Sequence, residues 1–185
     1  MRRIYLLMFA LMLCFSMANA QVIEGTVLKS WDGASGSIEI PANVTEIAAN
    51  CFYTPAEEDP DTWEVIAEEK SNTNITSVKL NNVKKIGKNA FRGCSNIETI
   101  DAPNVETIEE GAFYGLEKLT ILSLPSIKEL GMNAFEGCNQ IAKIALGSGL
   151  AKMFGNTFKG CKAVSDISVA AGGTYKAVQN AIVNP

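Results

Sequence analysis

One phenylalanine recurs along this chain at a nearly constant interval. It stands at Phe91, Phe113, Phe135 and Phe158, so successive copies are 22, 22 and 23 residues apart, and an earlier copy stands at Phe52. A period of about 20–29 residues is typical of solenoids, in which one repeat forms one coil. A single coil cannot bury its own apolar face, so coils stack on each other. The repeat therefore predicts a stack of coils.

The residues around this phenylalanine form columns of constant character. The positions eight and five residues before it are apolar, the position just before it is small, and the position three after it is Cys or Leu. Ahead of these lies an apolar triplet, such as Leu119, Leu122 and Leu124. These columns predict that one side of every coil is buried against its neighbours. The small residues just before the phenylalanine are Cys51, Ala90, Ala112, Ala134 and Thr157. The residues three positions after it are Cys94, Leu116, Cys138 and Cys161.

Two further columns predict where the backbone turns. Residues that tolerate a left-handed conformation lie two positions before each phenylalanine, and glycine lies two positions after the last four. We expect positive φ at both, or, for the first column, a ladder of Asn side chains bonding between coils. Proline after the triplet ends a strand. These residues are Asn50, Asn89, Gly111, Asn133 and Asn156; Gly93, Gly115, Gly137 and Gly160; and Pro41, Pro103 and Pro125.

The pattern resembles the leucine-rich repeats of the BspA-like, or Treponema pallidum-type, family over about residues 38–169. The segment 119–138, LTILSLPSIKELGMNAFEGC, matches it best, and Ile86, Gly87, Ala90, Phe91 and Cys94 match it again. The resemblance implies a right-handed, β-rich leucine-rich repeat solenoid of about five coils of 22–23 residues. Its parallel strands would be joined by tight turns or short helical turns. Departures from the pattern are Glu109, Phe154, Leu116 and the segment 147–149.

The first twenty residues read as a secretion signal. Arg2 and Arg3 precede an apolar run, and residues 18–20 form an A-x-A cleavage site, so the mature chain is expected to begin at Gln21. The alternative is a lipoprotein signal with Cys14 as the acylated residue. Either way we expect export, to the periplasm, the medium or the cell surface, with no membrane span after signal removal.

The segments flanking the repeats predict caps. Residues 21–37 contain Val27, Leu28 and Trp31, which would cover the first coil, with a turn at residues 32–33; the alternative is a disordered leader. Residues 170–185 would be a C-terminal cap, through Tyr175, Val178, Ile182 and Val183, or a truncated connecting unit. Solenoid ends need such covers.

An insertion at about residues 54–72 interrupts the first repeat. Insertions in repeats form loops on one face, often a binding face. Trp63, Val65 and Ile66 are expected to pin it to the body of the protein. Its carboxylates are expected to form a solvated acidic loop, with calcium binding as an alternative, although the EF-hand pattern is absent. The carboxylates considered for calcium are Glu57, Glu58, Asp59 and Asp61.

The outward positions within each triplet predict the contact surface for a partner. In leucine-rich repeats these positions point from a concave parallel sheet into solvent. We expect Ser77, Lys79, Thr99, Asp101, Ile121, Ser123, Lys143 and Asp166, together with Trp63, to bind a partner. A second outward column, Lys84, Glu106 and Lys128, predicts a ladder of alternating charge that fixes register.

The cysteine pattern favours buried free thiols over disulfides. Cys94 and Cys138 would lie two coils apart, beyond disulfide reach. Cys138 and Cys161 lie on neighbouring coils, and a bridge between them stays the alternative. Without a CxxC motif or any histidine, a zinc site is not expected.

Composition argues against catalysis and against nucleic acid. The absence of histidine removes the commonest general base, and no phosphate-binding glycine loop follows a strand. Without Arg2 and Arg3, 14 basic residues face 20 acidic ones, a net charge of −6, which disfavours nucleic-acid and anionic-membrane partners. No enzyme activity and no cofactor are expected.

Two functions remain from the sequence. The resemblance implies an exported module for adhesion to a protein, such as a host extracellular-matrix or plasma protein like fibronectin or fibrinogen. The alternative is a structural module that stacks with other repeat proteins. We expect a monomer or weak self-association. Glycan binding is less favoured because Trp31, Trp63, Tyr53 and Tyr114 are scattered along the sequence.

Overall fold

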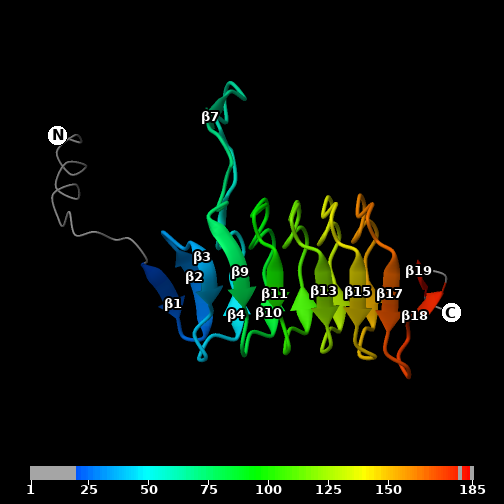
Figure 1. The fold of residues 1–185 in the computed structure, drawn as a ribbon. Helices are drawn as coiled ribbons and strands as arrows, with labels where there is room; N and C mark the ends of the chain where they lie inside the picture. The colour runs from blue at the N-terminus through cyan, green and yellow to red at the C-terminus, as the bar shows by residue number, and fades with distance from the viewer. Residues whose placement is uncertain (1–19, 179–180, 184–185) are drawn as a thin grey trace, which may run out of the picture.

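The chain forms a β-solenoid whose coils follow one another in a single row from the N-terminal to the C-terminal end (Figure 1). The computed structural model describes residues 20–178 and 181–183, and no helix occurs among them. The signal peptide predicted at residues 1–20, with its alternative acylation site at Cys14, therefore lies outside the described residues except for Ala20.

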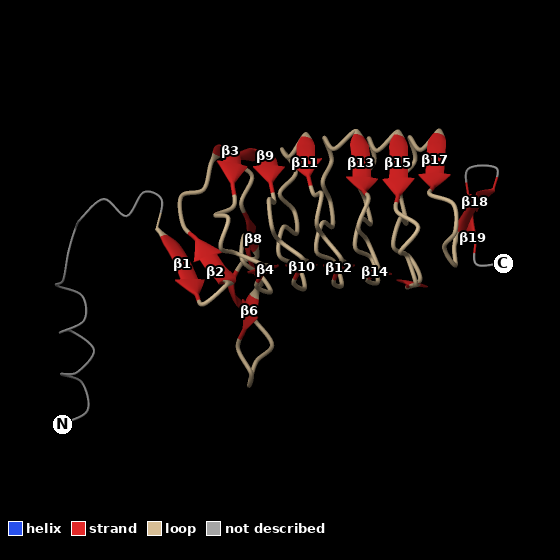
Figure 2. Ribbon diagram, turned by 90° about the horizontal axis from the view of Figure 1, so that it is seen from below, coloured by secondary structure: helices blue, strands red, loops and turns tan. Residues whose placement is uncertain are grey.

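Each coil contributes one strand to each of two walls, which lie on opposite sides of the stack (Figure 2). The back wall is a seven-stranded sheet of β1 (Gln21–Glu24), β2 (Val27–Trp31), β4 (Glu46–Ile47), β10 (Lys85–Ile86), β12 (Thr107–Ile108), β14 (Glu129–Leu130) and β16 (Lys152–Met153). The front wall consists of β3 (Gly36–Glu39), β9 (Ile75–Lys79), β11 (Thr99–Asp101), β13 (Ile121–Leu124), β15 (Lys143–Leu146) and β17 (Asp166–Val169).

Strands of successive coils are parallel, as the repeat predicted. In the back wall Lys85 of β10 pairs with Glu46 of β4 and with Thr107 of β12. The front wall is divided into two three-stranded sheets, one with β3, β9 and β11 and the other with β13, β15 and β17. The connections between the walls are tight turns.

The solenoid has about six turns, one more than the five that the resemblance implied. The extra turn begins at Val27, within residues 21–37 that were expected to cap the array, and ends at Glu39, two residues into the region expected to be solenoid. Leu28 of β2 pairs in parallel with Ile47, and Ile38 of β3 pairs with Val78, so this segment follows the path of the later coils. This turn was not among the five predicted coils because it is short and contains no copy of the repeating phenylalanine. The antiparallel strand β1 covers the outer edge of β2.

A continuous apolar core runs through the stack because each column buries against the same column in the next coil. The phenylalanine rings stack in one line, with centroids 4.6 Å apart between Phe52 and Phe91 and 5.2–5.6 Å apart along the rest. Trp31 ends this line, 6.4 Å from Phe52. Phe91 and Phe135 have no solvent exposure.

The two predicted corner columns adopt positive φ. Asn50, Asn89, Asn133 and Asn156 have φ between 54° and 61°, and Gly111 in the same column has φ 61°. The glycines two positions after phenylalanine have φ between 68° and 79°. Asn and Gly meet this demand with the least strain, so the corners explain why these residue types recur.

The insertion is a β-hairpin that leaves the coil path undisturbed. Tyr53 pairs with Ser71 and Thr54 with Lys70, in β5 (Tyr53–Thr54) and β8 (Lys70–Ser71); β6 (Glu57–Glu58) pairs with β7 (Val65–Ala67). Asn72 N–H then donates to Phe52 O, the bond that Cys94 N–H makes to Phe91 O in the next coil. Residues 54–70 are thus inserted between adjacent repeat positions, and we call them the arm.

The last described segment folds back on the final coil. The strands β18 (Lys176–Val178) and β19 (Ala181–Val183) pair with each other and contact β17. Tyr175 packs against the core, and its hydroxyl accepts a hydrogen bond from Met153 N–H at 3.2 Å. Of the four residues expected to cap this end, the structure therefore shows a core contact for Tyr175.

Candidate functional site

The front wall carries the predicted contact residues in two straight rows. Strand register places Ser77 beside Thr99 and Lys79 beside Asp101, and it places Lys143 between Ile121 and Asp166. Eight of the nine predicted residues therefore share one face. The first row is Ser37, Ser77, Thr99, Ile121, Lys143 and Asp166, and the second is Glu39, Lys79, Asp101, Ser123, Ala145 and Ser168. We call them the outer rows.

The N-terminal part of the outer rows is tied together by side-chain bonds. Ser77 and Ser37 are joined by a hydroxyl hydrogen bond of 2.6 Å, and Lys79 Nζ donates to Glu39 Oε1 at 3.0 Å. The Asn81 amide also donates to Glu39, and together with Lys79 it lowers the pKa of that carboxyl. Ser37 and Glu39 were missed from sequence because the apolar triplet before Phe52 is incomplete, with Gly36 standing opposite Ile75 of the next coil.

The C-terminal part of the outer rows is open. Ile121, the first residue of β13, is 58% exposed. Lys143 and Asp166 lie beside each other, and no ion pair found among the described residues involves either. One apolar side chain and two unpaired charges therefore face solvent together.

Trp63 is not brought to the outer rows. It lies near the tip of the arm, which rises above the coils (Figure 1) and, seen from below, extends on the side away from the front wall (Figure 2). The expectation that the apolar residues of the arm pin it to the body is wrong, because Trp63 is 76%, Val65 51% and Ile66 60% exposed. Backbone pairing holds the arm instead.

One acidic residue of the arm, Asp59, stabilises the turn at its tip. Asp59 Oδ1 accepts hydrogen bonds from the N–H groups of Thr62 and Asp61, and these bonds lower the pKa of the Asp59 carboxyl. Within residues 20–178 and 181–183, no three acidic or cysteine side chains are grouped as a metal site requires. Calcium binding by Glu57, Glu58, Asp59 and Asp61 stays a prediction.

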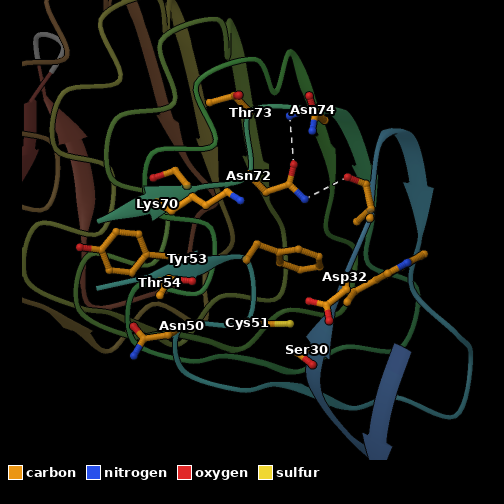
Figure 3. A pocket seen from close by; sticks show the side chains of 15 residues that line it. Ser30, Asp32, Asn50, Cys51, Tyr53, Thr54, Lys70, Asn72, Thr73 and Asn74 are labelled. Atoms are coloured by element: carbon orange, nitrogen blue, oxygen red, sulfur yellow. Dashed lines mark hydrogen bonds between the residues drawn. The ribbon is translucent and has the colours of Figure 1, made fainter. Parts of the chain in front are cut away.

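A pocket of about 490 Å³ lies at the base of the arm (Figure 3). The short first turn leaves the corner of the next coil uncovered, so residues 30–34 form one wall and residues 70–74 the other. Asn72 lies across it and donates to Ala34 O at 2.9 Å, while its own oxygen accepts Asn74 N–H. The fold thus brings Trp31 and Tyr53 to one cavity, although they are 22 residues apart in sequence.

The cysteines behave as the repeat predicted. Cys51, Cys94, Cys138 and Cys161 are free thiols, and the first three are buried. Burial raises the pKa of Cys51, Cys94 and Cys138 from 9.0 to about 12, and that of Cys161 to about 11. The Cys138 and Cys161 thiols each donate to the carbonyl of a phenylalanine in the preceding coil, at 3.2 Å. Such thiols are poor nucleophiles.

Ion pairs between side chains of neighbouring coils form ladders. Several of them involve the column six residues before the phenylalanine, which was not predicted to carry a ladder. Lys85 bridges Glu109 and Glu46, at 3.0 and 3.1 Å, and these carboxylates raise its pKa in that order. Lys152 pairs with Glu129 in the same wall. In the predicted column, Lys128 pairs with Glu106 at 2.6 Å, while Lys84 contributes only a weaker attraction that helps lower the Glu106 pKa. Exposed pairs of this kind stabilise little.

The stacked parallel coils, tight Asn and Gly corners and phenylalanine line define a leucine-rich repeat solenoid. The sequence model for the BspA type leucine rich repeat region matches residues 68–181 in six copies. This chain belongs to that family.

Solved structures show the same fold. A T. pallidum leucine-rich repeat protein superposes with a TM-score of 0.67 at 17% identity, over 83% of this chain and 69% of that one. A leucine-rich repeat protein from Bacteroides ovatus gives 0.62 at 21% identity, over 82% of this chain and 39% of that one. The pneumococcal vaccine antigen PcpA gives 0.56 at 22% identity, over 78% and 33%. Among curated proteins, no relative matches this sequence.

Within the part of the chain that the structure describes, no helix has the length and apolarity needed to cross a membrane.

Proposed function

We propose that this protein is an exported binding module that holds another protein on the outer rows. The observation that carries the proposal is the open C-terminal part of the rows, where exposed Ile121 lies beside Lys143, and Lys143 lies beside Asp166. An exposed apolar side chain on the outer face of a strand adds little to the stability of the solenoid itself. A single exposed apolar side chain is common, so the proposal rests on its setting at one end of a row that continues with the unpaired charges of Lys143 and Asp166.

The mechanism is contact with a preorganised surface. The strands are fixed by hydrogen bonds and by a core without exposure at most of its positions, so little backbone order is lost on binding. Ile121 supplies the apolar contact, and Lys143 and Asp166 select for a partner with matching charges. The partner we propose is an extracellular-matrix or plasma protein of a host, which the family resemblance implies.

Export is the second part of the proposal. It is supported by the sequence of residues 1–20, with two arginines, an apolar run and an A-x-A site. N-terminal sequencing of the protein recovered outside the cytoplasm tests it. We expect Gln21 as the first residue, and an intact Met1 in that fraction would contradict the proposal.

We propose no catalysis. The chain has no histidine, and burial keeps the thiols of Cys51, Cys94 and Cys138 protonated at neutral pH. The chain still contains carboxylates, lysines and tyrosines, which can act as acids or bases in other proteins. The support for binding is therefore the surface itself and not the absence of catalytic groups.

Binding of residues 21–185 to immobilised fibronectin, fibrinogen and other matrix proteins tests the proposed function. We expect saturable binding that falls at least tenfold in the double variant Ile121→Ser, Lys143→Glu. Met132→Ser is the matched control, because Met132 is 48% exposed and lies outside the rows. Equal loss in the control, or no loss in the double variant, would contradict a site on the outer rows.

Assembly with other repeat proteins is the alternative. It is supported by the last coil, where Phe158, Cys161 and Ile167 are only partly buried although their equivalents in earlier coils are mostly buried. Sedimentation over a hundredfold range of concentration tests it. A mass that rises with concentration, with no capture by matrix proteins, would favour assembly over adhesion.

Saccharide binding is a second candidate, favoured by the pocket at the base of the arm. Its aromatic Trp31 and its amides Asn50 and Asn74 suit the apolar faces and hydroxyls of a sugar. A titration with neutral oligosaccharides in the Trp63→Asn background leaves Trp31 as the single tryptophan reporter. An unchanged emission at millimolar sugar would exclude this candidate.

A further inference from the structure

The arm combines two features that are found together nowhere else in the described part of the chain. Trp63, Val65 and Ile66 form a group of exposed large apolar side chains within four successive positions. The arm also holds seven carboxylates, Glu57, Glu58, Asp59, Asp61, Glu64, Glu68 and Glu69, against the single cation Lys70. Its net charge is therefore −6.

The charge of the chain is segregated on this one hairpin. Residues 20–53 and 71–185 contain 13 acidic and 13 basic residues, so the solenoid body is balanced and the arm carries the whole excess. Its carboxylates are exposed, except for the half-buried Asp59. A projecting element of one sign attracts an oppositely charged surface and accelerates encounter with it.

The arm is braced and not a slack loop. At its base Tyr53 Oη donates to Glu69 Oε2 at 2.6 Å, and the Arg92 guanidinium lies over the rings of Tyr53 and Tyr114, 5.6 and 4.1 Å from their centroids. At its tip Asp59 N–H donates to Glu64 O at 2.8 Å, and Trp63 N–H donates to Asp59 O at 2.9 Å. The apolar residues therefore have fixed positions.

The tip holds Trp63 in a conformation that its side chain disfavours. Its φ is 59°, in the left-handed region where Gly or Asn is expected. Every other described residue with positive φ is Asn or Gly. A large indole at such a position, 76% exposed, gains nothing from the fold of the hairpin.

We propose that the arm is a separate docking element for a basic protein segment, in which Trp63, Val65 and Ile66 contact apolar side chains and the surrounding carboxylates pair with lysine or arginine. Arginine is the favoured cation, because its guanidinium both pairs with carboxylates and stacks on an indole ring. The proposal deepens the proposed protein-binding function but uses a different surface, since the arm points away from the outer rows (Figure 2).

Three peptides of equal length test the chemistry. The first contains arginine and leucine, the second arginine and serine, and the third glutamate and leucine, and each is titrated into residues 21–185 with the combined emission of Trp31 and Trp63 as the readout. We expect the first to bind at least tenfold more tightly than either of the others, with an affinity that falls as salt rises. Equal binding of the first two would overturn the apolar part of the proposal, and binding of the third would overturn the charge part.

Substitutions in the arm test where the peptide binds. Binding is followed by the fluorescence anisotropy of a labelled arginine and leucine peptide. Trp63→Asn removes the ring and suits the left-handed backbone, and Val65→Thr with Ile66→Thr removes apolar surface while keeping strand-forming residues. We expect at least a tenfold loss in the first variant and a several-fold loss in the second, with unchanged circular dichroism. Met132→Ser is the control on the solenoid body and should bind as the parent does.

The outer-row variant separates this proposal from the proposed function. Ile121→Ser, Lys143→Glu is expected to bind the arginine and leucine peptide normally while losing the matrix protein. Loss of peptide binding in that variant, with retention in Trp63→Asn, would overturn docking at the arm and leave the outer rows as the one binding surface.

Discussion

At the scale of single residues, the buried thiols link stability to alkaline pH. Below about pH 9 the thiols are protonated in both the folded and unfolded chains, so they contribute no pH dependence. Between pH 9 and the raised folded pKa of about 12, the unfolded chain releases protons that the folded chain retains. The free energy of unfolding should therefore fall, by about 1.4 kcal/mol per pH unit for each thiol.

Cys138→Ala isolates that effect from the titration of lysine and tyrosine. We expect the urea-unfolding free energy of the variant to fall less steeply above pH 9 than that of the parent, by roughly the contribution of one thiol. Parallel slopes in the two proteins would show that Cys138 is not buried in a protonated form.

Two glycines, Gly131 and Gly155, differ in how closely another part of the backbone approaches them. A Cβ on Gly131 would lie 2.6 Å from the backbone C of Glu109 and the N of Glu110, whereas at Gly155 nothing lies within 4 Å. We expect Gly131→Ala to reduce the free energy of unfolding by about 1–3 kcal/mol. Gly155→Ala, the control, should change it by under about 1 kcal/mol, and equal effects would contradict the packing assigned to Gly131.

The sequence predicted well which repeat positions turn the backbone and which side chains face outward. Asn133 and Gly137 could be placed at positive φ, and Ile121 on the outer face, because a repeat averages the demands of one backbone over several copies. Ser37 and Glu39 were missed since Gly36 stands where Ile75 begins the triplet of the next coil, so the triplet before Phe52 is incomplete. Pairing of Lys85 with Glu109 depends on side-chain reach between coils, which spacing alone does not specify.

At the scale of elements, the arm should be dispensable for folding. Deleting residues 54–70 joins Tyr53 to Ser71, which are adjacent positions of the repeat, as Arg92 and Gly93 are in the next coil. We expect the deletion variant to fold with the same circular dichroism and a free energy of unfolding within about 1–2 kcal/mol of the parent, since exposed contacts contribute little. An unfolded deletion variant would show that the arm supports the coil and is not a simple insertion.

The behaviour of the insertion shows what composition alone leaves open. Three large apolar residues in one loop predict packing on the body, because burial of such side chains is the commoner outcome. In this chain the strand pairing of Tyr53 with Ser71 directs the hairpin away from the coils, so Trp63, Val65 and Ile66 have no apolar surface within reach. Strand direction at the base was not readable from the sequence.

At the scale of the whole molecule, the continuous core predicts one cooperative unit. Phe113 lies in the middle of the ring line, 5.2 Å from Phe91 and 5.3 Å from Phe135, with 1% exposure. We expect Phe113→Ala to reduce the free energy of unfolding by about 3–5 kcal/mol. Phe154→Ala, at 38% exposure, should reduce it by under about 1 kcal/mol, and comparable losses would contradict a core built on the phenylalanine line.

Methyl NMR of isoleucine in residues 21–185 tests most directly whether outward surfaces of a rigid solenoid bind protein. Ile121 on the outer rows and Ile66 on the arm are exposed, whereas Ile86 and Ile108 have no exposure. On addition of the matrix protein that retains the chain, we expect the Ile121 methyl signal to shift or broaden first, with Ile86 and Ile108 unchanged. Binding that leaves both exposed methyls unchanged, or that shifts the buried ones, would contradict recognition by a preformed surface.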